Sequence, residues 1–238
     1  MMKSSNPNNV NQWDLKMIKL YELAGKNNLI FSPYCWRVRL ALLHKQVDFA
    51  GLDTAFTEIE KIPNGEFKAV PVLVDDNIAI NDSFHIVEHL EEKYPLAPSL
   101  FNSPEGKTLA KFIDAWASSL HGDIAKMVIA DIHDCLQDKD KNYFRTSREQ
   151  FFGENLESIQ AENYQTAKKN LLSKLSVLDA HLTKSEFIGG PTPLYADFIA
   201  FGTLQWLIAT SQTFIVSDFS ATIEQWFIKI KQMYCGEK

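Results

Sequence analysis

Residues 29–45 read LIFSPYCWRVRLALLHK, an apolar run followed directly by residues with helical spacing. At their junction stands Ser32-Pro33-Tyr34-Cys35, a C-P-Y-C redox motif in which serine replaces the first cysteine. That first cysteine is normally the reactive thiolate, because it lies at the N-terminus of a helix. The stretch therefore predicts a helix whose first turn carries a hydroxyl where a redox protein carries its reactive thiol.

The serine at this junction has two interpretations. Ser32 before Pro33 makes a good N-cap with proline at the first helical position, and capping alone would account for both residues. The same helix end also favours an anion, because its N–H groups are unpaired and the helix dipole is positive there. In that case the Ser32 hydroxyl donates a hydrogen bond to a bound thiolate without competing as a nucleophile.

Cys35 offers an alternative centre for the sulfur chemistry. It follows Ser32 by three residues and lies among leucines of the same helical pattern. We expect its side chain to point into the domain, where cysteines are usually inert. A reactive Cys35 would instead indicate thiol–disulfide chemistry, so both residues remain candidates from the sequence.

The first half of the chain predicts a small sheet covered by helices. Residues 18–23 alternate apolar and polar side chains as a half-buried strand does, and residues 47–54 supply a second strand. Residues 72–74 and 78–80 flank an Asp-Asp-Asn turn and predict a hairpin. Residues 82–94 begin with an Asp-Ser cap and continue with helical spacing. The order is β-α-β followed by β-β-α.

The second half shows only helical patterns. Prolines at 95, 98 and 104 mark the best candidate linker. Apolar residues then recur at spacings of three and four over 105–136 and again over 164–182. Residues 194–208 are nearly all apolar and predict a central buried helix, and an amphipathic helix covers 223–233. An all-helical second domain over residues 104–235 follows from these patterns.

Charge and cysteine content narrow the class of protein. The 238 residues carry 24 Lys and Arg against 30 Asp and Glu, a net charge of −6. This balance argues against a nucleic-acid-binding surface, which requires clustered basic residues. The three cysteines, at 35, 135 and 235, are odd in number and far apart, which indicates a reducing compartment. We therefore expect a cytoplasmic protein with no nucleic-acid partner.

The first sixteen residues are polar and rich in asparagine. They lack the apolar core of a secretory signal and the arginine-rich pattern of a transit peptide, so we expect a disordered tail. Met17 stands directly before the first strand-like run, which leaves Met1 and Met17 as alternative translation starts. No apolar run is long and continuous enough to predict a membrane span, so we expect no membrane partner.

From Met17 to Cys235 the order of these features resembles the cytosolic glutathione transferases. Residues 31–45 resemble the first strand-to-helix junction of serine-type bacterial and fungal members, including the etherase-like branch. AVPVLVDD at 69–76 resembles the proline junction before the third strand, and NDSFHIVEHLEEKYP at 81–95 resembles the acidic-Ser pair with its helix. Residues 147–158 and 187–206 also resemble this branch. The resemblance implies a thioredoxin-like N-terminal domain over 17–97 and an all-α C-terminal domain over 104–235.

The resemblance also implies a glutathione site. In this family a cis Pro71 exposes the backbone of Val70, which then pairs with the cysteinyl part of glutathione. Ser83 and the following helix N-terminus hold the γ-glutamyl carboxylate, while Asp82, where relatives often carry glutamate, faces the amino group. Lys68 is a candidate for the glycyl carboxylate. Glutathione is thus the expected co-substrate, with Ser32 stabilising its thiolate as the catalytic residue.

The second substrate and the assembly follow from the same resemblance. A small hydrophobic electrophile would bind between the domains, where ligand sites often form. Tyr34, Trp116, Leu120 and Ile124 are candidates for its pocket. Relatives usually form homodimers, so a homodimer with two-fold symmetry is expected. A module that binds glutathione or apolar ligands with little turnover is an alternative, because a fold does not determine an activity.

Residues 85–89, HIVEH, match the H-x-x-E-H spelling of one class of zinc peptidases. His85 and His89 would share a helix face with Glu88 close by, which makes a zinc hydrolase a third hypothesis. The apolar residues lie opposite this face, which is typical of a solvated helix surface, and we expect no metal. The remaining histidines, at 44, 121, 133 and 181, form no set with ligand spacing.

One position departs from the family pattern. Relatives usually have Ser, Thr or Asn three residues before the aspartate that corresponds to Asp197, where it caps the buried helix. This chain has Leu194 there, and Thr192 is a candidate cap from further back. A missing N-cap costs about 1 kcal/mol, so we expect an effect on stability, which is no argument against activity.

Overall fold

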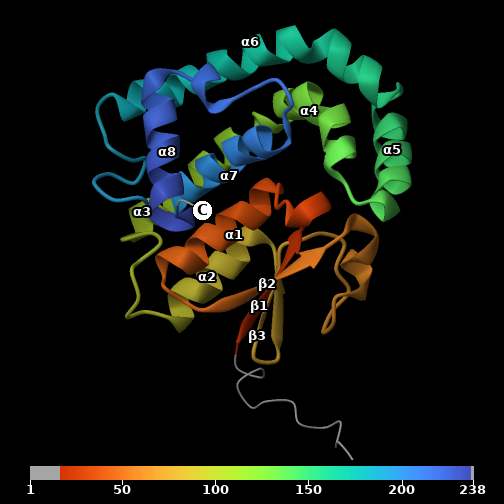
Figure 1. Cartoon of the computed structure of the whole chain (residues 1–238). Helices are drawn as coiled ribbons and strands as arrows, with labels where there is room; N and C mark the ends of the chain where they lie inside the picture. The colour runs from red at the N-terminus through yellow and green to blue at the C-terminus, as the bar shows by residue number, and fades with distance from the viewer. Residues whose placement is uncertain (1–16, 237–238) are drawn as a thin grey trace, which may run out of the picture.

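The computed structural model describes residues 17–236, and the predictions for residues 1–16 lie outside this range. An α/β domain packs beneath an all-helical domain, in which the long helix α6 (Leu156–Leu182) runs across the top of the molecule and α7 (Tyr195–Thr210) lies above α1 (Pro33–His44) (Figure 1). This is the fold class predicted from the sequence. Among the helices of residues 17–236, none is both long and apolar enough to cross a bilayer.

The N-terminal domain is a four-stranded sheet in the order β2-β1-β3-β4. Its elements are β1 (Ile18–Leu23), η1 (Lys26–Asn28), α1 (Pro33–His44), β2 (Phe49–Thr54), η2 (Phe56–Lys61), β3 (Val72–Asp75), β4 (Ile78–Asn81) and α2 (Ser83–Lys93), where η denotes a 3₁₀ helix. β1 pairs in parallel with β2 and antiparallel with β3, which pairs antiparallel with β4. The predicted hairpin is confirmed.

The C-terminal domain consists of α3 (Pro104–Ser118), α4 (His121–Cys135), α5 (Asp138–Phe152), α6 (Leu156–Leu182), α7 (Tyr195–Thr210), η3 (Val216–Asp218) and α8 (Ala221–Cys235). The prediction of α7 as a central buried helix is confirmed, because nearly all its side chains are buried. The pattern over 105–136 is divided between α3 and α4. The sequence analysis did not assign α5, whose composition is largely polar and charged.

Small polar residues begin several helices, as their sequence positions suggest. The side chains of Ser32, Asp82, Ser103, Asn155 and Ser220 accept backbone N–H groups at the starts of α1, α2, α3, α6 and α8. These caps satisfy donors that the first helical turn leaves unpaired.

A close approach of α7 to α1 sets the position of the helix start at Ser32. A Cβ atom on Gly202 would lie 2.5 Å from the carbonyl oxygen of Pro33 and 3.3 Å from Cγ of Arg37. Glycine is therefore required where the two helices cross, because a larger residue would push α1 away. Trp36 packs edge-to-face on Phe201 beside this crossing, with ring centroids 6.1 Å apart. The helical domain thus fixes the N-terminus of α1.

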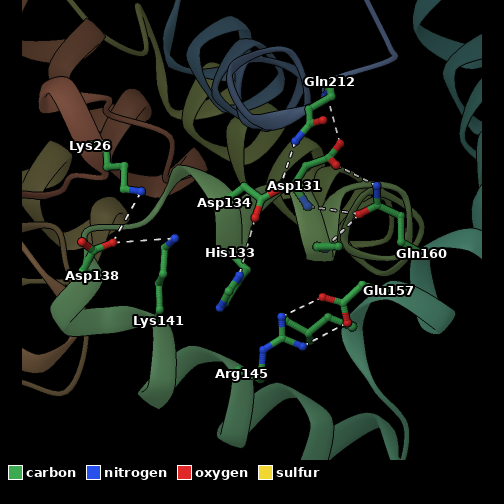
Figure 2. A network of polar contacts seen from close by, with 12 residues as sticks. Lys26, Asp131, His133, Asp134, Asp138, Lys141, Arg145, Glu157, Gln160 and Gln212 are labelled. Atoms are coloured by element: carbon green, nitrogen blue, oxygen red, sulfur yellow. Dashed lines mark hydrogen bonds and ion pairs between the residues drawn. The ribbon is translucent and has the colours of Figure 1, made fainter.

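Polar side chains hold α4, α5 and α6 together (Figure 2). The Asp131 carboxylate on α4 accepts Nε2 of Gln160 on α6 and the backbone N–H of Gln212, each at 2.9 Å. On α5, Arg145 pairs with Glu157 at the start of α6. Asp138, at the start of α5, lies 3.5 Å from Lys26 of the other domain. Arg145, in the middle of α5, therefore ties this helix to α6, and in Figure 1 α5 reaches down toward the segment after β2.

Candidate functional site

Ser32 lies at the first turn of α1 and faces two adjoining cavities. The backbone N–H of Cys35 lies 3.4 Å from the Ser32 hydroxyl oxygen, so the serine is the N-cap of α1. Ser32 is 6% exposed, and its side chain lines both cavities. Capping and contact with a ligand are therefore compatible at this residue.

The first cavity is a polar cleft of about 620 Å³ along the α/β domain. It is lined by Leu23, Ser32, Phe56, Thr57, Ile59, Glu60, Lys68, Ala69, Val70, Tyr143 and Arg148. Three residues of the predicted glutathione site, Ser32, Lys68 and Val70, are thus brought together. The Val70–Pro71 peptide bond is cis, as the resemblance implies.

Asp82 and Ser83 lie beside the Val70–Pro71 segment. Asn81 Nδ2 donates to the carbonyl oxygens of Ala69 and Pro71, each at 2.9 Å, and fixes that segment against the end of β4. Asp82 Oδ1 accepts the N–H groups of Phe84 and His85 at 2.8 and 3.1 Å, so this side chain is itself the N-cap of α2. Neither Asp82 nor Ser83 lines the cleft around Ser32, and Ser83 is buried.

Arg37 supplies a buried positive charge that the sequence analysis missed. Its side chain is 1% exposed, and Nη1 donates to Asp114 at 2.5 Å. Within residues 17–236 its Nε and Nη2 atoms have no hydrogen-bond partner. Burial raises the pKa of Tyr195, and the charge of Arg37 opposes this rise. The Tyr195 hydroxyl donates to the Ser83 carbonyl at 3.2 Å, so the positive charge of Arg37 lies close to the start of α2.

The second cavity, of about 500 Å³, lies between the domains and is mainly aromatic. Its lining residues are Leu23, Phe31, Ser32, Pro33, Tyr34, Phe56, His121, Ala125, Ile129, Ile132, Phe144, Ser147, Arg148, Phe151, Phe152 and Trp206. It shares Leu23, Ser32, Phe56 and Arg148 with the polar cleft. Ser32 therefore stands where an apolar cavity meets a polar one.

Of the predicted pocket residues, only Tyr34 lines this cavity. Leu120 and Ile124 are 0% exposed and belong to the core, while Trp116 lines a separate groove of about 190 Å³ between α3 and α6. Leu120 and Ile124 each precede a residue of α4 that lines the cavity, and one residue turns an α-helix by about 100°, so their side chains face the core. The face of α4 that lines the cavity carries His121, Ala125, Ile129 and Ile132.

His121 is a further residue that sequence reasoning missed, because the histidines were compared only for ligand spacing. Its ring lies edge-on to Tyr34 and Trp206, with centroids 5.6 and 5.5 Å away. Burial, with a contribution from the charge of Arg37, lowers the pKa of His121 to about 4. The imidazole is therefore neutral at neutral pH and forms an uncharged wall of the cavity.

Cys35 is placed in the core and away from both cavities. Its side chain is 0% exposed, and Sγ lies 3.4 Å from the backbone N–H of Leu23. Burial, with a contribution from the charge of Glu22, raises the pKa of the Cys35 thiol to about 12. A protonated, buried thiol is a poor nucleophile. The geometry thus gives no support to the reductase alternative.

The polar side chains of the H-x-x-E-H motif at residues 85–89 do not converge on a common site. His89 Nε2 lies 2.8 Å from Asp75, and Glu88 pairs with Lys107 at 2.8 Å, while the His85 side chain is 72% exposed. Over the described range, 17–236, no three His, Cys, Asp or Glu side chains are grouped to hold a metal ion. The geometry gives no support to the zinc hydrolase hypothesis.

Comparison with known proteins identifies the family. The family model described as "Glutathione S-transferase, N-terminal domain" matches residues 28–99, and the model described as "Glutathione S-transferase, C-terminal domain" matches residues 109–226. The chain belongs to the glutathione S-transferase family. It is 28% identical to glutathione S-transferase U28 of Arabidopsis thaliana over 197 residues, which cover 81% of this chain and 75% of the relative.

Solved structures of the family have the same fold. A glutathione transferase of Phanerochaete chrysosporium superimposes with a TM-score of 0.78 at 23% identity, covering 93% of this chain and 97% of its own. A glutathione S-transferase of Ceriporiopsis subvermispora, solved in complex with glutathione, gives 0.80 at 20% identity, covering 92% and 96%. Family membership supports glutathione transferase activity, for which the two adjoining cavities provide space.

Proposed function

We propose that this glutathione transferase is of the serine type and uses Ser32 to stabilise the glutathione thiolate. Glutathione occupies the polar cleft of the domain over 17–97, and the helical domain over 104–235 supplies much of the cavity for a hydrophobic electrophile. The observation that carries the proposal is the position of Ser32 on the walls of both cavities. A thiolate held there faces the cavity in which the second substrate would lie.

The reaction follows from this placement. The dipole of the α1 N-terminus favours the thiolate over the thiol. The Ser32 hydroxyl donates a hydrogen bond to the sulfur, which then attacks an electrophilic carbon in the aromatic cavity. The new S–C bond forms as the leaving group departs with its electron pair. In keeping with the resemblance to the etherase-like branch, an activated aryl ether is one form of this electrophile.

The remaining glutathione contacts are proposed from the positions of the predicted residues. Val70, which lines the cleft beside the cis bond, pairs through its backbone with the cysteinyl part. Lys68, in the same cleft, receives the glycyl carboxylate. Ser83 and Asp82 at the start of α2 hold the γ-glutamyl end, where Asn81 keeps them next to the Val70 segment.

The test is Ser32→Ala. We expect kcat/KM with glutathione to fall about 10- to 150-fold, because a hydrogen bond to a charged group contributes about 1.5–3 kcal/mol. Glutathione affinity measured by calorimetry should change little, because most contacts of the tripeptide lie elsewhere. The pKa of the bound thiol, read from thiolate absorbance, should rise in the variant.

Cys35→Ser is the matched control for this experiment, because it changes the other residue of the motif and leaves the cavity walls intact. Transfer should continue with a modest loss of stability. If Ser32→Ala stays active and Cys35→Ser is inactive, the chemistry runs through Cys35 and the serine mechanism is wrong. Absence of glutathione binding at millimolar concentration would reject the transferase assignment itself and leave a binding module.

We also propose that the protein is a homodimer, as the resemblance implies. An exposed apolar groove between α3 and α6 supports this assembly, since Phe112 and Val177 on its walls are 68% and 64% exposed. A second copy that covers this groove would remove their side chains from water.

Light scattering should give about twice the 27.1 kDa mass of one chain. Phe112→Glu should shift this value toward the monomer, whereas Met233→Glu on α8 should not. A wild-type monomer at micromolar concentration would reject the proposal.

A further inference from the structure

The guanidinium of Arg148 lies where the polar cleft and the aromatic cavity meet. Its central carbon lies 5.0 Å from the centroid of the Phe144 ring and 5.8 Å from that of Phe56. Nη1 also donates to Ser147 Oγ at 3.2 Å. Two aromatic rings and a hydroxyl therefore hold this cation at the edge of the cavity, in a range typical of cation–π contacts.

Within residues 17–236, Arg148 has no carboxylate partner of the kind that a neighbouring arginine on the same helix has. Arg145 pairs with Glu149 at 2.8 Å and with Glu157 at 2.7 Å. Arg148 takes part in none of the ion pairs found within residues 17–236, and no Asp or Glu is among the residues that line the aromatic cavity. Its charge is thus available to a ligand.

At neutral pH Arg148 is the one side chain that carries a charge among the residues found to line the aromatic cavity. His121, the other titratable nitrogen base among the lining residues, is neutral there because burial lowers its pKa to about 4. Apolar walls weaken the hydration of a guanidinium and strengthen its attraction to an anion. An oxyanion placed beside Arg148 would gain charge-assisted and often bidentate hydrogen bonds.

We propose that Arg148 makes the cavity selective for an aromatic second substrate that carries a carboxylate or a comparable oxyanion. This inference rests on the proposed transferase function and adds the class of its second substrate. The rings of Phe31, Tyr34 and Trp206 contact the aromatic frame, while Arg148 binds the anionic group and turns the opposite end toward Ser32. The volume of about 500 Å³ fits a molecule of this size.

Turnover tests the selectivity with a matched pair of electrophiles at saturating glutathione. The pair is para-chloro-dinitrobenzoate and the corresponding carboxamide, which differ in charge and hardly in shape. In Arg148→Gln the ratio of kcat/KM for the carboxylate to that for the carboxamide should fall roughly 10- to 100-fold. Arg148→Lys should restore part of it. Arg145→Gln should leave the ratio at the wild-type value. A ratio that is unchanged in Arg148→Gln overturns the inference.

Binding separates this inference from the proposed function. Protein fluorescence, to which Trp206 in the cavity wall contributes, is titrated with dinitrobenzoate and with dinitrobenzamide. Saturating S-methylglutathione is present, so that the polar cleft is filled. The benzoate should bind about tenfold more tightly than the benzamide, and Arg148→Gln should abolish the difference. Equal affinities in the wild-type protein would overturn the inference even if transfer is active. The preference can also be measured if no electrophile is turned over.

Discussion

Asp197→Ala is expected to lower the free energy of unfolding by on the order of 4 kcal/mol or more, since each buried donor left unpaired costs about 1–3 kcal/mol. The Asp197 side chain is fully buried, and its carboxylate accepts four hydrogen bonds. The donors are the N–H groups of Ile188, Gly189 and Leu194 and Nε1 of Trp226, at 2.7 to 3.0 Å. Because whole domains are stable by about 5–15 kcal/mol, this variant should be close to unfolding.

Asp197→Asn tests whether the carboxylate itself is needed, because asparagine keeps the shape of the side chain and replaces one acceptor oxygen by an NH₂ group. Oδ1 accepts from Ile188 and Trp226, and Oδ2 accepts from Gly189 and Leu194. Either orientation of the amide therefore points an NH₂ group at two N–H donors, so asparagine should also destabilise strongly. Denaturant unfolding measures both variants, with Asp48→Asn at an exposed position as the control. Wild-type stability in both Asp197 variants would show that the carboxylate is not needed.

The same aspartate explains why the departure at Leu194 is tolerated. The sequence predicts a missing cap at Leu194, with Thr192 as the candidate substitute. Among the residues that the structure describes, no N-cap side chain bonds to the start of α7, but Asp197 accepts the Leu194 N–H at 3.0 Å from within the first turn. Its bonds to Ile188 and Gly189 also tie down the preceding loop. This role depends on a turn whose conformation the spacing of residues does not reveal.

Elements with a strong local pattern were predictable from the sequence. The hairpin of β3 and β4, the Asp-capped α2 and the apolar α7 each show their own period or cap. α5 was not predictable in this way. Its sequence, DKDKNYFRTSREQFF, has aromatic residues at 143, 144, 151 and 152 and polar residues elsewhere, so the helix shows no apolar stripe of the usual width.

The candidate site was likewise predictable from the sequence only in part. Ser32, Val70 and Lys68, which the sequence predicts for one site because they lie in or beside recognisable motifs, line the same cleft. The aromatic cavity is built by side chains from separate elements. Which of these side chains line it depends on how α4 and α5 are rotated over α1. His121 stands in no motif, and the stretch 147–158 that contains Arg148 does not reveal this rotation. Leu120 and Ile124 precede two lining residues of α4 by one position each, which turns them into the core.

Asp140→Ala should disturb both cavities at once. The Asp140 side chain on α5 is fully buried, and its carboxylate accepts the N–H groups of Phe56 and Thr57 at 2.7 and 3.0 Å, together with the Thr57 hydroxyl at 2.8 Å. It thus caps η2 across the domain boundary. Removing it leaves two backbone donors without this partner, with an expected loss of about 2–5 kcal/mol in the free energy of unfolding.

The functional effect follows from where the two joined elements lie. Phe56 and Arg148, one from each side of this contact, line both the polar cleft and the aromatic cavity. Once α5 is no longer held against η2, both walls should become mobile. KM for glutathione and KM for the electrophile should therefore rise together, while the pKa of the bound thiol at Ser32 should stay near its wild-type value.

Asp138→Ala is the matched control, because it removes a carboxylate two residues away on the same helix. Asp138 is 87% exposed and pairs with Lys26 and Lys141 at 3.5 and 3.7 Å (Figure 2). Exposed ion pairs contribute little to stability, so melting temperature and both KM values should hardly change. If Asp138→Ala and Asp140→Ala behave alike, or if Asp140→Ala raises only one KM, the buried contact does not hold the shared wall. A rise in both KM values confined to Asp140→Ala would show that α5 and η2 position the two substrates as a unit.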